Sequence, residues 1–281
     1  MKTGEEPQKP QSWPDCDEAV QKYVSGLVDL LKCELKDNLT GVYLHGSLAT
    51  GSWFWPKSDL DVLAVVYKRL DPERARETNL SIARYAENRP LTGGVELSVI
   101  TAETAGNVPD AMPFELHYSE DWRQRILDDQ VVYGNAPVDI DLQAHLMCVK
   151  KRGVCLFGKR IGEVFGDVSW RNFLAAVLDD FSWIMADENI CESPYYGILN
   201  ICRVLQTVTE KDQRILSKYE GGMWGLEDLP DEYIPLIQKA LDIYSSRTAV
   251  AESERRTGGV HWDKRRLLAL RDYAKRIVYE N

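Results

Sequence analysis

Two aspartates separated by one residue stand at the start of an apolar segment. Asp59 and Asp61 lead into the run Val62–Val66, which has the length and composition of a buried strand. Residues two apart on a strand point to the same face, so the two carboxylates would project together. Adjacent carboxylates repel one another and need a compensating cation, and oxygen ligands beside phosphate select Mg²⁺. The pair predicts a magnesium site with Asp59 and Asp61 as metal ligands.

A glycine and a serine follow the apolar segment upstream of this pair. Gly46 and Ser47 come directly after a predicted strand over Gly41–Leu44 and its neighbour His45. Glycine lets the backbone approach a ligand closely, and the serine offers a hydroxyl and an amide where a helix begins. Such turns bind phosphate through free N–H groups. We therefore expect Gly46 and Ser47 to bind the phosphates of a nucleotide.

A third acid, Glu96, begins the next predicted strand, Val95–Ile100. If that strand lies beside Asp59–Val66, the three carboxylates converge. They would then hold the triphosphate of ATP through Mg²⁺ and leave one carboxylate to accept a proton from an attacking hydroxyl. A lone D-x-D can be a solvated strand edge and Gly-Ser is a common helix cap, but chance is a poor explanation for all the features in this order. Glu96 is therefore predicted to be the catalytic base and a third metal ligand.

The elements that must position these residues form an α+β chain. A helix opened by Pro14 and Asp15 precedes the strands. Val154–Phe157 is predicted to be an edge strand. The later predicted helices are Pro72–Asn88, Asp139–Arg152, Trp170–Glu188, Tyr195–Thr209, Glu232–Arg247 and Lys264–Tyr279. Strand patterns stop near Gly166. We expect a flexible tail over residues 1–14, a sheet domain over 15–166 and an all-α domain over 167–281, with Gly221–Gly222 and Leu226–Pro230 as its main loop.

The charge balance narrows the class of partner. The 281 residues carry a formal net charge of −10, which is poorly suited to nucleic acid, where clustered Lys and Arg supply most of the affinity. A cationic small molecule is the more natural partner. No apolar run reaches membrane-spanning length and the start of the chain is polar. We therefore expect a cytoplasmic protein that binds neither membrane nor nucleic acid, and a monomer.

The cysteines and histidines show no metal pattern. Six cysteines occur without a C-x-x-C pair, which is typical of free thiols in a reducing compartment. His117, His145 and His261 show no spacing shared with acids or cysteines. We therefore expect no zinc site.

The segments Val42–Ser47 and Ser58–Val66 resemble the nucleotidyltransferase superfamily, whose hallmark is a strand, a Gly-Ser turn and a D-h-D pair on the following strand. Within it, the chain is similar to the streptomycin and spectinomycin O-adenylyltransferases over most of its length after the tail. The similarity continues at Val95–Ile100, which matches the family's Val-Glu strand, and at Glu115–Trp122, which is similar to its Glu-Leu-x-x-x-Glu-Trp segment. Asp139–Leu142 and Cys155–Gly158 are similar to its Asp-Ile-Asp-Leu helix and its Leu-x-Gly strand end. Leu199–Arg203 matches its arginine helix.

The resemblance implies an N-terminal nucleotidyltransferase-fold domain followed by a helical domain that closes over substrate and nucleotide. It implies that Arg203 and Lys218 bind the triphosphate and that Trp122 lines the drug pocket. One departure concerns the substrate: the family's drug-binding acidic residue falls at Ser193, with Glu192 next to it. Either the loop Asp187–Ser193 is shifted or substrate preference differs, so the antibiotic stays open.

The activity that the resemblance implies is Mg²⁺-dependent transfer of AMP from ATP to a hydroxyl of a streptomycin- or spectinomycin-type antibiotic. Pyrophosphate would leave, and the modification would give antibiotic resistance. Two alternatives stay open: the same chemistry on a protein, RNA or metabolite acceptor, and a nucleotide-binding protein without catalysis. Three mutually repelling acids argue against the second, because a pure binder has no need of them.

Overall fold

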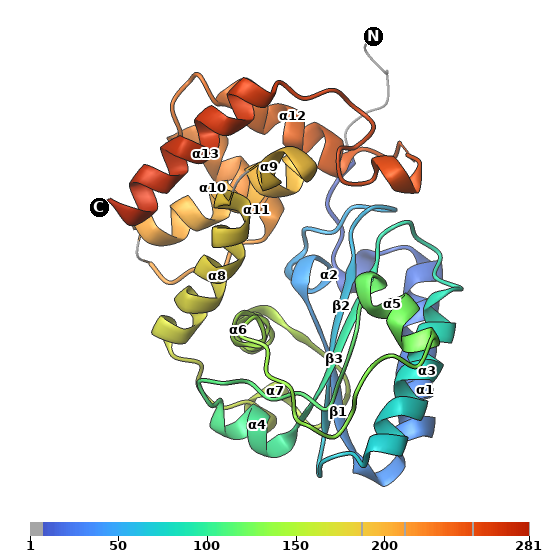
Figure 1. The fold of residues 1–281 in the computed structure, drawn as a ribbon. Coiled ribbons are helices and arrows are strands. Elements are labelled where there is room, and N and C mark those ends of the chain that lie inside the picture. Colours follow the sequence, from blue (N-terminus) through green and yellow to red (C-terminus); the bar gives the residue numbers. More distant parts are fainter. Residues whose placement is uncertain (1–7, 187, 211, 249, 281) are drawn as a thin grey trace. The chain divides into compact units, whose positions relative to one another are not determined.

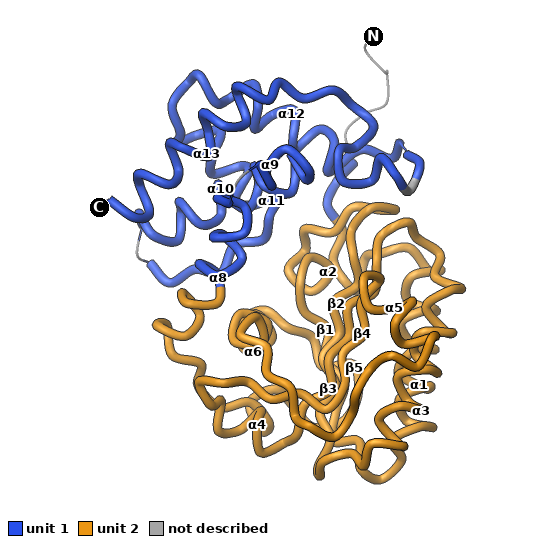
Figure 2. The backbone as a smooth tube through the Cα atoms, viewed as in Figure 1, with its two compact units in different colours: residues 1–10, 177–281 blue, residues 11–176 orange. Residues whose placement is uncertain are grey.

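The computed structural model describes residues 8–186, 188–210, 212–248 and 250–280, which form two compact units (Figure 2). A sheet unit comprises Gln11–Ala176, and a helical unit comprises the described parts of Met1–Pro10 and Val177–Asn281. The boundary falls inside helix α8 (Trp170–Met185), later than the predicted one at residues 166 and 167. The first turns of α8 are tied to the sheet unit, where Asn172 Nδ2 donates to Asp110 Oδ1 at 3.0 Å.

The predicted tail is divided between the two units. Residues 1–7 lie outside the described part of the chain, Gln8 Nε2 donates to the Ser245 carbonyl at 2.9 Å, and Gln11 forms a β-bridge with Trp53. The helix expected to open at Pro14 and Asp15 begins later. Trp13–Asp15 is a separate 3₁₀ turn, and α1 (Glu18–Leu35) starts where the Asp17 carboxylate accepts a hydrogen bond from the Ala19 amide at 2.8 Å.

The sheet unit is built on five strands in the order β4-β3-β2-β1-β5. They are β1 (Leu39–His45), β2 (Leu60–Val66), β3 (Val95–Thr101), β4 (Leu116–Tyr118) and β5 (Val154–Gly158). Strands β2 and β3 are parallel, and the other neighbouring pairs are antiparallel. The four predicted strands are confirmed, and β5 lies at the edge as expected. Strand β4 was not predicted, because three residues are too few to show a period.

Helices cover both faces of this sheet (Figure 1). On one face lie α1 and α3 (Pro72–Ala86), and on the other lie α4 (Ala102–Asn107), α6 (Leu142–Arg152) and α7 (Ile161–Val164). Two short helices complete the unit, α2 (Gly46–Thr50) and α5 (Glu120–Leu127). Buried on both sides, β2 is an almost continuous apolar run rather than an alternating one. Each face of the sheet therefore has its own apolar core, and α6 lies over the face toward which Leu63 and Val65 point.

The helical unit continues from α8 with five more helices. They are α9 (Asn189–Glu192), α10 (Pro194–Glu210), α11 (Lys218–Asp228), α12 (Ile234–Ser245) and α13 (Lys264–Tyr279). Among the described residues of the chain, no helix combines the length and the apolar character that crossing a membrane requires. The expectation of an α+β chain with a sheet first and helices after it is confirmed.

The loop predicted at Gly221–Gly222 and Leu226–Pro230 is wrong for all but its last two residues, because helix α11 continues to Asp228 and only Leu229 and Pro230 follow it. Ser217 and Glu220 cap its first turn reciprocally, at 3.1 and 2.8 Å. The glycines serve close packing of helices: a Cβ on Gly221 would lie 2.9 Å from the Arg203 Cα of α10. Glycine here reports a helix contact and not a turn.

Candidate active site

The three predicted acids lie on one face of the sheet, at one end of neighbouring strands. The register pairs Asp61 of β2 with Glu96 of β3 on one side and with His45 of β1 on the other. Paired residues of adjacent strands project to the same face. The register therefore aligns Asp61 with Glu96, and Asp59, in the turn before β2, lies near enough to raise the pKa of Glu96.

The turn at Gly46 is shaped around Asp61. Gly46 has φ +62°, and a Cβ placed on it would lie 1.7 Å from Asp61 Oδ2. No other residue fits, because both the backbone conformation and the contact exclude a side chain. Ser47 follows as the second residue of α2, and the Arg152 guanidinium of α6 donates to the Thr50 carbonyl at the end of that helix at 2.6 Å. The backbone thus approaches the acids closely where a phosphate ligand was predicted.

Asp59 is oriented by the turn before β3. Its carboxylate accepts a hydrogen bond from the Gly94 amide, and its carbonyl accepts one from the Trp53 indole at 3.2 Å. Gly93 packs against the Ser58 carbonyl so closely that a Cβ would lie 2.2 Å from its oxygen. The Gly93–Gly94 pair, read from sequence as a strand boundary, therefore also positions one of the acids.

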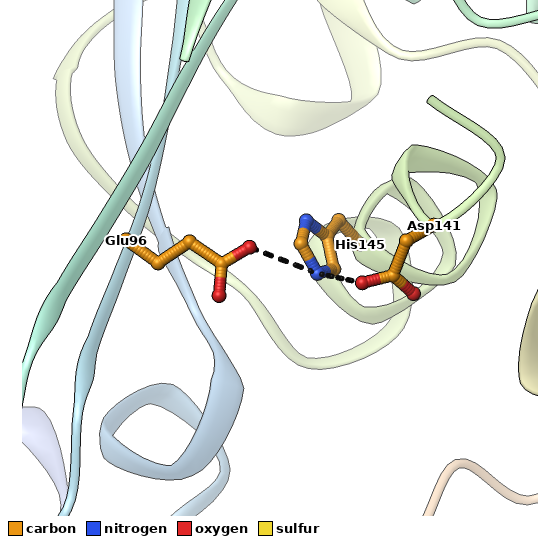
Figure 3. A group of neighbouring side chains, drawn as sticks. All are labelled: Glu96, Asp141 and His145. Carbon is orange, nitrogen blue, oxygen red and sulfur yellow. Dashed lines mark ion pairs between the residues drawn. The ribbon is translucent and has the colours of Figure 1, made fainter. Parts of the chain in front are cut away.

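Helix α6 brings two further groups to the same place. His145 Nε2 lies 3.0 Å from Oδ2 of Asp141, the N-cap residue of α6, and 3.7 Å from Glu96 Oε1 on β3 (Figure 3). The His145 ring also lies against His45, with ring centroids 4.6 Å apart. Sequence reasoning missed Asp141 and His145, and the statement that His145 shares no spacing with acids is wrong. The signal was their separation by four residues within the predicted helix Asp139–Arg152, which puts both side chains on one face.

Burial and charge shift the pKa values of this group. Burial raises the pKa of Glu96, and Asp141 and Asp59 raise it further against the opposing effect of His145. Burial opposes a charge on His145, yet Asp141 and Glu96 hold its pKa well above the usual value. Burial and the neighbouring His145 hold the pKa of His45 well below its usual range. The site therefore pairs one protonated imidazole with several acids and keeps a second imidazole neutral.

The predicted phosphate ligands Arg203 and Lys218 lie on α10 and at the start of α11 in the helical unit. Lys218 Nζ lies 5.1 Å from the centre of the Tyr196 ring, whose hydroxyl donates to Asp180 at 3.0 Å. Burial and Asp180 raise the pKa of Tyr196, while Lys218 and Arg203 both lower it, so both cations lie near this ring. Arg203 Nε is buried with no hydrogen-bond partner among the described residues.

The residues predicted to contact the drug lie in two places. Trp122, on α5, is partly buried against the core under α1 and α3, with its ring 5.5 Å from that of His117 and the Arg125 guanidinium 4.9 Å from its centre. Glu192 ends α9 and is exposed, whereas Ser193 is buried and its carbonyl accepts a hydrogen bond from Gly197 at 2.8 Å. Asp187, the first residue of the loop that departs from the family pattern, lies outside the described residues.

Comparison with known proteins adds three findings. A family model described as the aminoglycoside adenylyltransferase C-terminal domain matches residues 163–261. An aminoglycoside (3'') (9) adenylyltransferase of Klebsiella pneumoniae is 26% identical over 231 residues, covering 80% of this chain and 85% of the relative, and one of Escherichia coli is equally similar. A crystal structure of a spectinomycin adenyltransferase from Enterococcus faecialis, with ATP and spectinomycin, matches with a TM-score of 0.72 and 21% identity over 91% of this chain and 99% of that one. This last likeness establishes the fold.

Proposed function

We propose, from its membership of the aminoglycoside nucleotidyltransferase family, that this protein transfers AMP from ATP to a hydroxyl of an aminoglycoside or aminocyclitol antibiotic. The observation that carries the proposal is the strand register that aligns Asp61 with Glu96, next to Asp59 in the turn before β2. Nucleotidyl transfer needs such acids, because they would hold a metal ion that offsets the negative charge developing on the phosphate oxygens.

The residues fit Mg²⁺. Asp59, Asp61 and Glu96 supply only carboxylate oxygens, which are the ligands that this ion prefers, and the Gly46 backbone lies directly against Asp61. When bound, the ion would offset the charge that develops on the phosphate oxygens in the transition state. We assign Asp59 and Asp61 as its ligands, with Glu96 as a further one.

Glu96 is the proposed proton acceptor. The drug hydroxyl attacks the α-phosphorus, its proton passes to the Glu96 carboxylate, and the bond between the α-phosphorus and the bridging oxygen breaks, releasing pyrophosphate. The raised pKa of this buried carboxylate suits the role, because a base works best when its pKa approaches the working pH. In this proposal Glu96 binds and moves a proton, and Gly46 and Ser47 hold the nucleotide's phosphates.

The helical unit supplies the other proposed contacts except Trp122, which lies on α5 of the sheet unit. Arg203 and Lys218 are the proposed ligands of the triphosphate, and the unpartnered buried Nε of Arg203 supports this because an oxyanion would satisfy it. Trp122, Glu192 and Ser193 are the proposed drug contacts. The formal net charge of −10 favours a polycationic substrate over an anionic one.

Pyrophosphate release tests the proposal. Purified protein with Mg²⁺-ATP is supplied in turn with spectinomycin, streptomycin and a 2-deoxystreptamine drug, and the modified drug is identified by its gain of one adenylyl group in mass. We expect release with at least one of these acceptors and none without acceptor. Asp59→Asn and Glu96→Gln should abolish it, whereas Glu73→Gln, a matched change at an exposed acid in the first turn of α3, should not.

Three results would contradict the proposal. Release that persists in both Asp59→Asn and Glu96→Gln would overturn the site. Release with protein or RNA but with none of the drugs would overturn the acceptor while leaving the chemistry intact. ATP binding without release in the presence of every acceptor would overturn catalysis.

A further inference from the structure

The chemistry proposed above uses Asp59, Asp61 and Glu96 and leaves Asp141 and His145 without a task. His145 lies on α6 and Asp141 is the N-cap residue of that helix. One ligand atom from each of Glu96, Asp141 and His145 lies within 4.8 Å of those of the other two. Figure 3 shows the imidazole between the two carboxylates, which come from elements far apart in the sequence. We propose that Glu96, Asp141 and His145 form a second divalent-cation site, which takes a transition-metal ion such as Mn²⁺ and shares only Glu96 with the Mg²⁺ site of Asp59 and Asp61.

The spacing suits a common ion. His145 Nε2 is 3.0 Å from Asp141 Oδ2 and 3.7 Å from Glu96 Oε1. Ligands about 2.1 Å from one ion lie roughly 3.0–3.5 Å apart around it, so small side-chain rotations complete the shell. Asp141 and His145 are spaced by four residues on one helix, and the backbone of Glu96 is held by the β2–β3 register. The three groups are therefore brought together by rigid elements rather than by a loop.

The donor types distinguish this site from its neighbour. Asp59 and Asp61 offer oxygen only, which suits Mg²⁺, whereas a nitrogen with two carboxylates favours Mn²⁺ and the later first-row ions. The neutral ring of His45 from β1 and the thiol of Cys148 from α6 complete the surroundings, and neither adds positive charge at this point.

Charge at this point also favours a cation. Acidic side chains come to this point from three directions: Asp61 of β2 is paired in register with Glu96 of β3, and Asp141, at the start of α6, lies 3.0 Å from His145 Nε2. The single imidazole is therefore surrounded by several carboxylates. A divalent ion in its place would offset more of that repulsion.

The test is Mn²⁺ binding followed by electron paramagnetic resonance on the nucleotide-free full chain. Mn²⁺ is the probe because the six free thiols would capture Zn²⁺. A large excess of Mg²⁺ is present throughout, so that oxygen-only sites such as Asp59–Asp61 are blocked. We expect one bound Mn²⁺ whose dissociation constant rises at least tenfold in His145→Gln and in Asp141→Asn.

Two controls sharpen the test. His261→Gln changes an exposed histidine outside the cluster and should leave Mn²⁺ binding unchanged, and Asp59→Asn should retain it. Thermal unfolding checks that each variant is folded, and if His145→Gln is not, Asp141→Asn decides alone. Absence of Mn²⁺ binding by the wild-type chain would overturn the proposal and leave His145 as an ion-pair partner only. Binding lost in Asp59→Asn but kept in His145→Gln would overturn it as well.

The proposed function could fail without touching this inference. If both hold, Glu96 is common to the two sites, and an ion bound to it competes with its role as proton acceptor. Saturating Mn²⁺ then lowers adenylyl transfer more in the wild-type chain than in His145→Gln. The binding measurement needs no turnover, so the failure of one proposal is distinguishable from the failure of the other.

Discussion

The two units position their charged residues by different means. In the sheet unit, Asp61 and Glu96 are aligned by backbone hydrogen bonds between β2 and β3, and Gly46 closes on Asp61 with no space for a Cβ. In the helical unit, Arg203 and Lys218 reach from two helices on long side chains, around the ring of Tyr196. Strand register leaves little freedom, whereas long side chains adapt. Changes in the first region should therefore affect the chemical step, and changes in the second the binding of ATP.

The largest effect is expected for Asp61→Asn. Removing one of two adjacent carboxylates weakens the metal site, and turnover should fall about 10³-fold, because several kcal/mol of charge stabilisation is lost. The fold should not suffer, since repulsion with Asp59 and Glu96 is relieved. Pyrophosphate release and thermal unfolding measure the two quantities, with Asp29→Asn on the exposed side of α1 as control. A variant that keeps more than a tenth of its turnover would remove Asp61 from the site.

Gly46→Ala tests whether the backbone turn itself is required. The new Cβ would collide with Asp61 Oδ2 and needs a positive φ, so we expect about a 10²-fold loss of turnover and a loss of stability of about 1–3 kcal/mol. Gly162→Ala is the matched control, because a Cβ there meets nothing within 4 Å and its φ is not positive. Equal behaviour of the two variants would mean that the close approach at Gly46 has no consequence.

Arg203→Gln tests the helical unit. A lost charged contact with phosphate typically weakens binding by about 1–3 kcal/mol, so the KM for ATP should rise roughly 5- to 100-fold while kcat changes little. Arg265→Gln, an exposed arginine of α13, is the control. A fall in kcat with an unchanged KM would reverse the comparison drawn between the two units.

The smallest effect concerns acid stability of the sheet unit. Burial lowers the pKa of His117 to about 4, and its ring lies 2.9 Å from the Ser98 hydroxyl. The unfolded chain binds a proton at this histidine near pH 6.5, whereas the folded chain does not. The free energy of unfolding is therefore unaffected by this group above about pH 6.5 and falls by about 1–3 kcal/mol toward pH 4. In His117→Gln this fall in the free energy of unfolding at acid pH should disappear, whereas the His261→Gln variant should still show it. Denaturant unfolding between pH 4 and 7 measures it.

Much of the fold could be predicted from local pattern. The strands around Asp59, Asp61 and Glu96 were recognised because each joins a continuous apolar run to a polar residue at its start, and their type follows from composition. Helix α13 was predicted at its observed bounds, since its apolar period is regular. The site acids were predictable for the same reason, because a D-x-D pair on a strand has one geometry only.

Other features depended on contacts between distant segments. Helix α11 was taken for a loop because Gly221 and Gly222 signal turns locally, and only their packing against α10 explains them. Strand β4 is too short for its sequence to mark it, and its pairing with β3 defines it.

The sequence by itself determined the pair of acids, their shared face and the glycine turn before them, because two-residue periodicity and the conformational freedom of glycine act within a few residues. Only the tertiary structure decided which groups join them. It set Glu96 beside Asp61 by register, and it brought His145 of α6 within 3.7 Å of Glu96 of β3, although the two residues lie on elements far apart in the sequence. Such contacts come from packing a helix on a sheet, which no local pattern encodes.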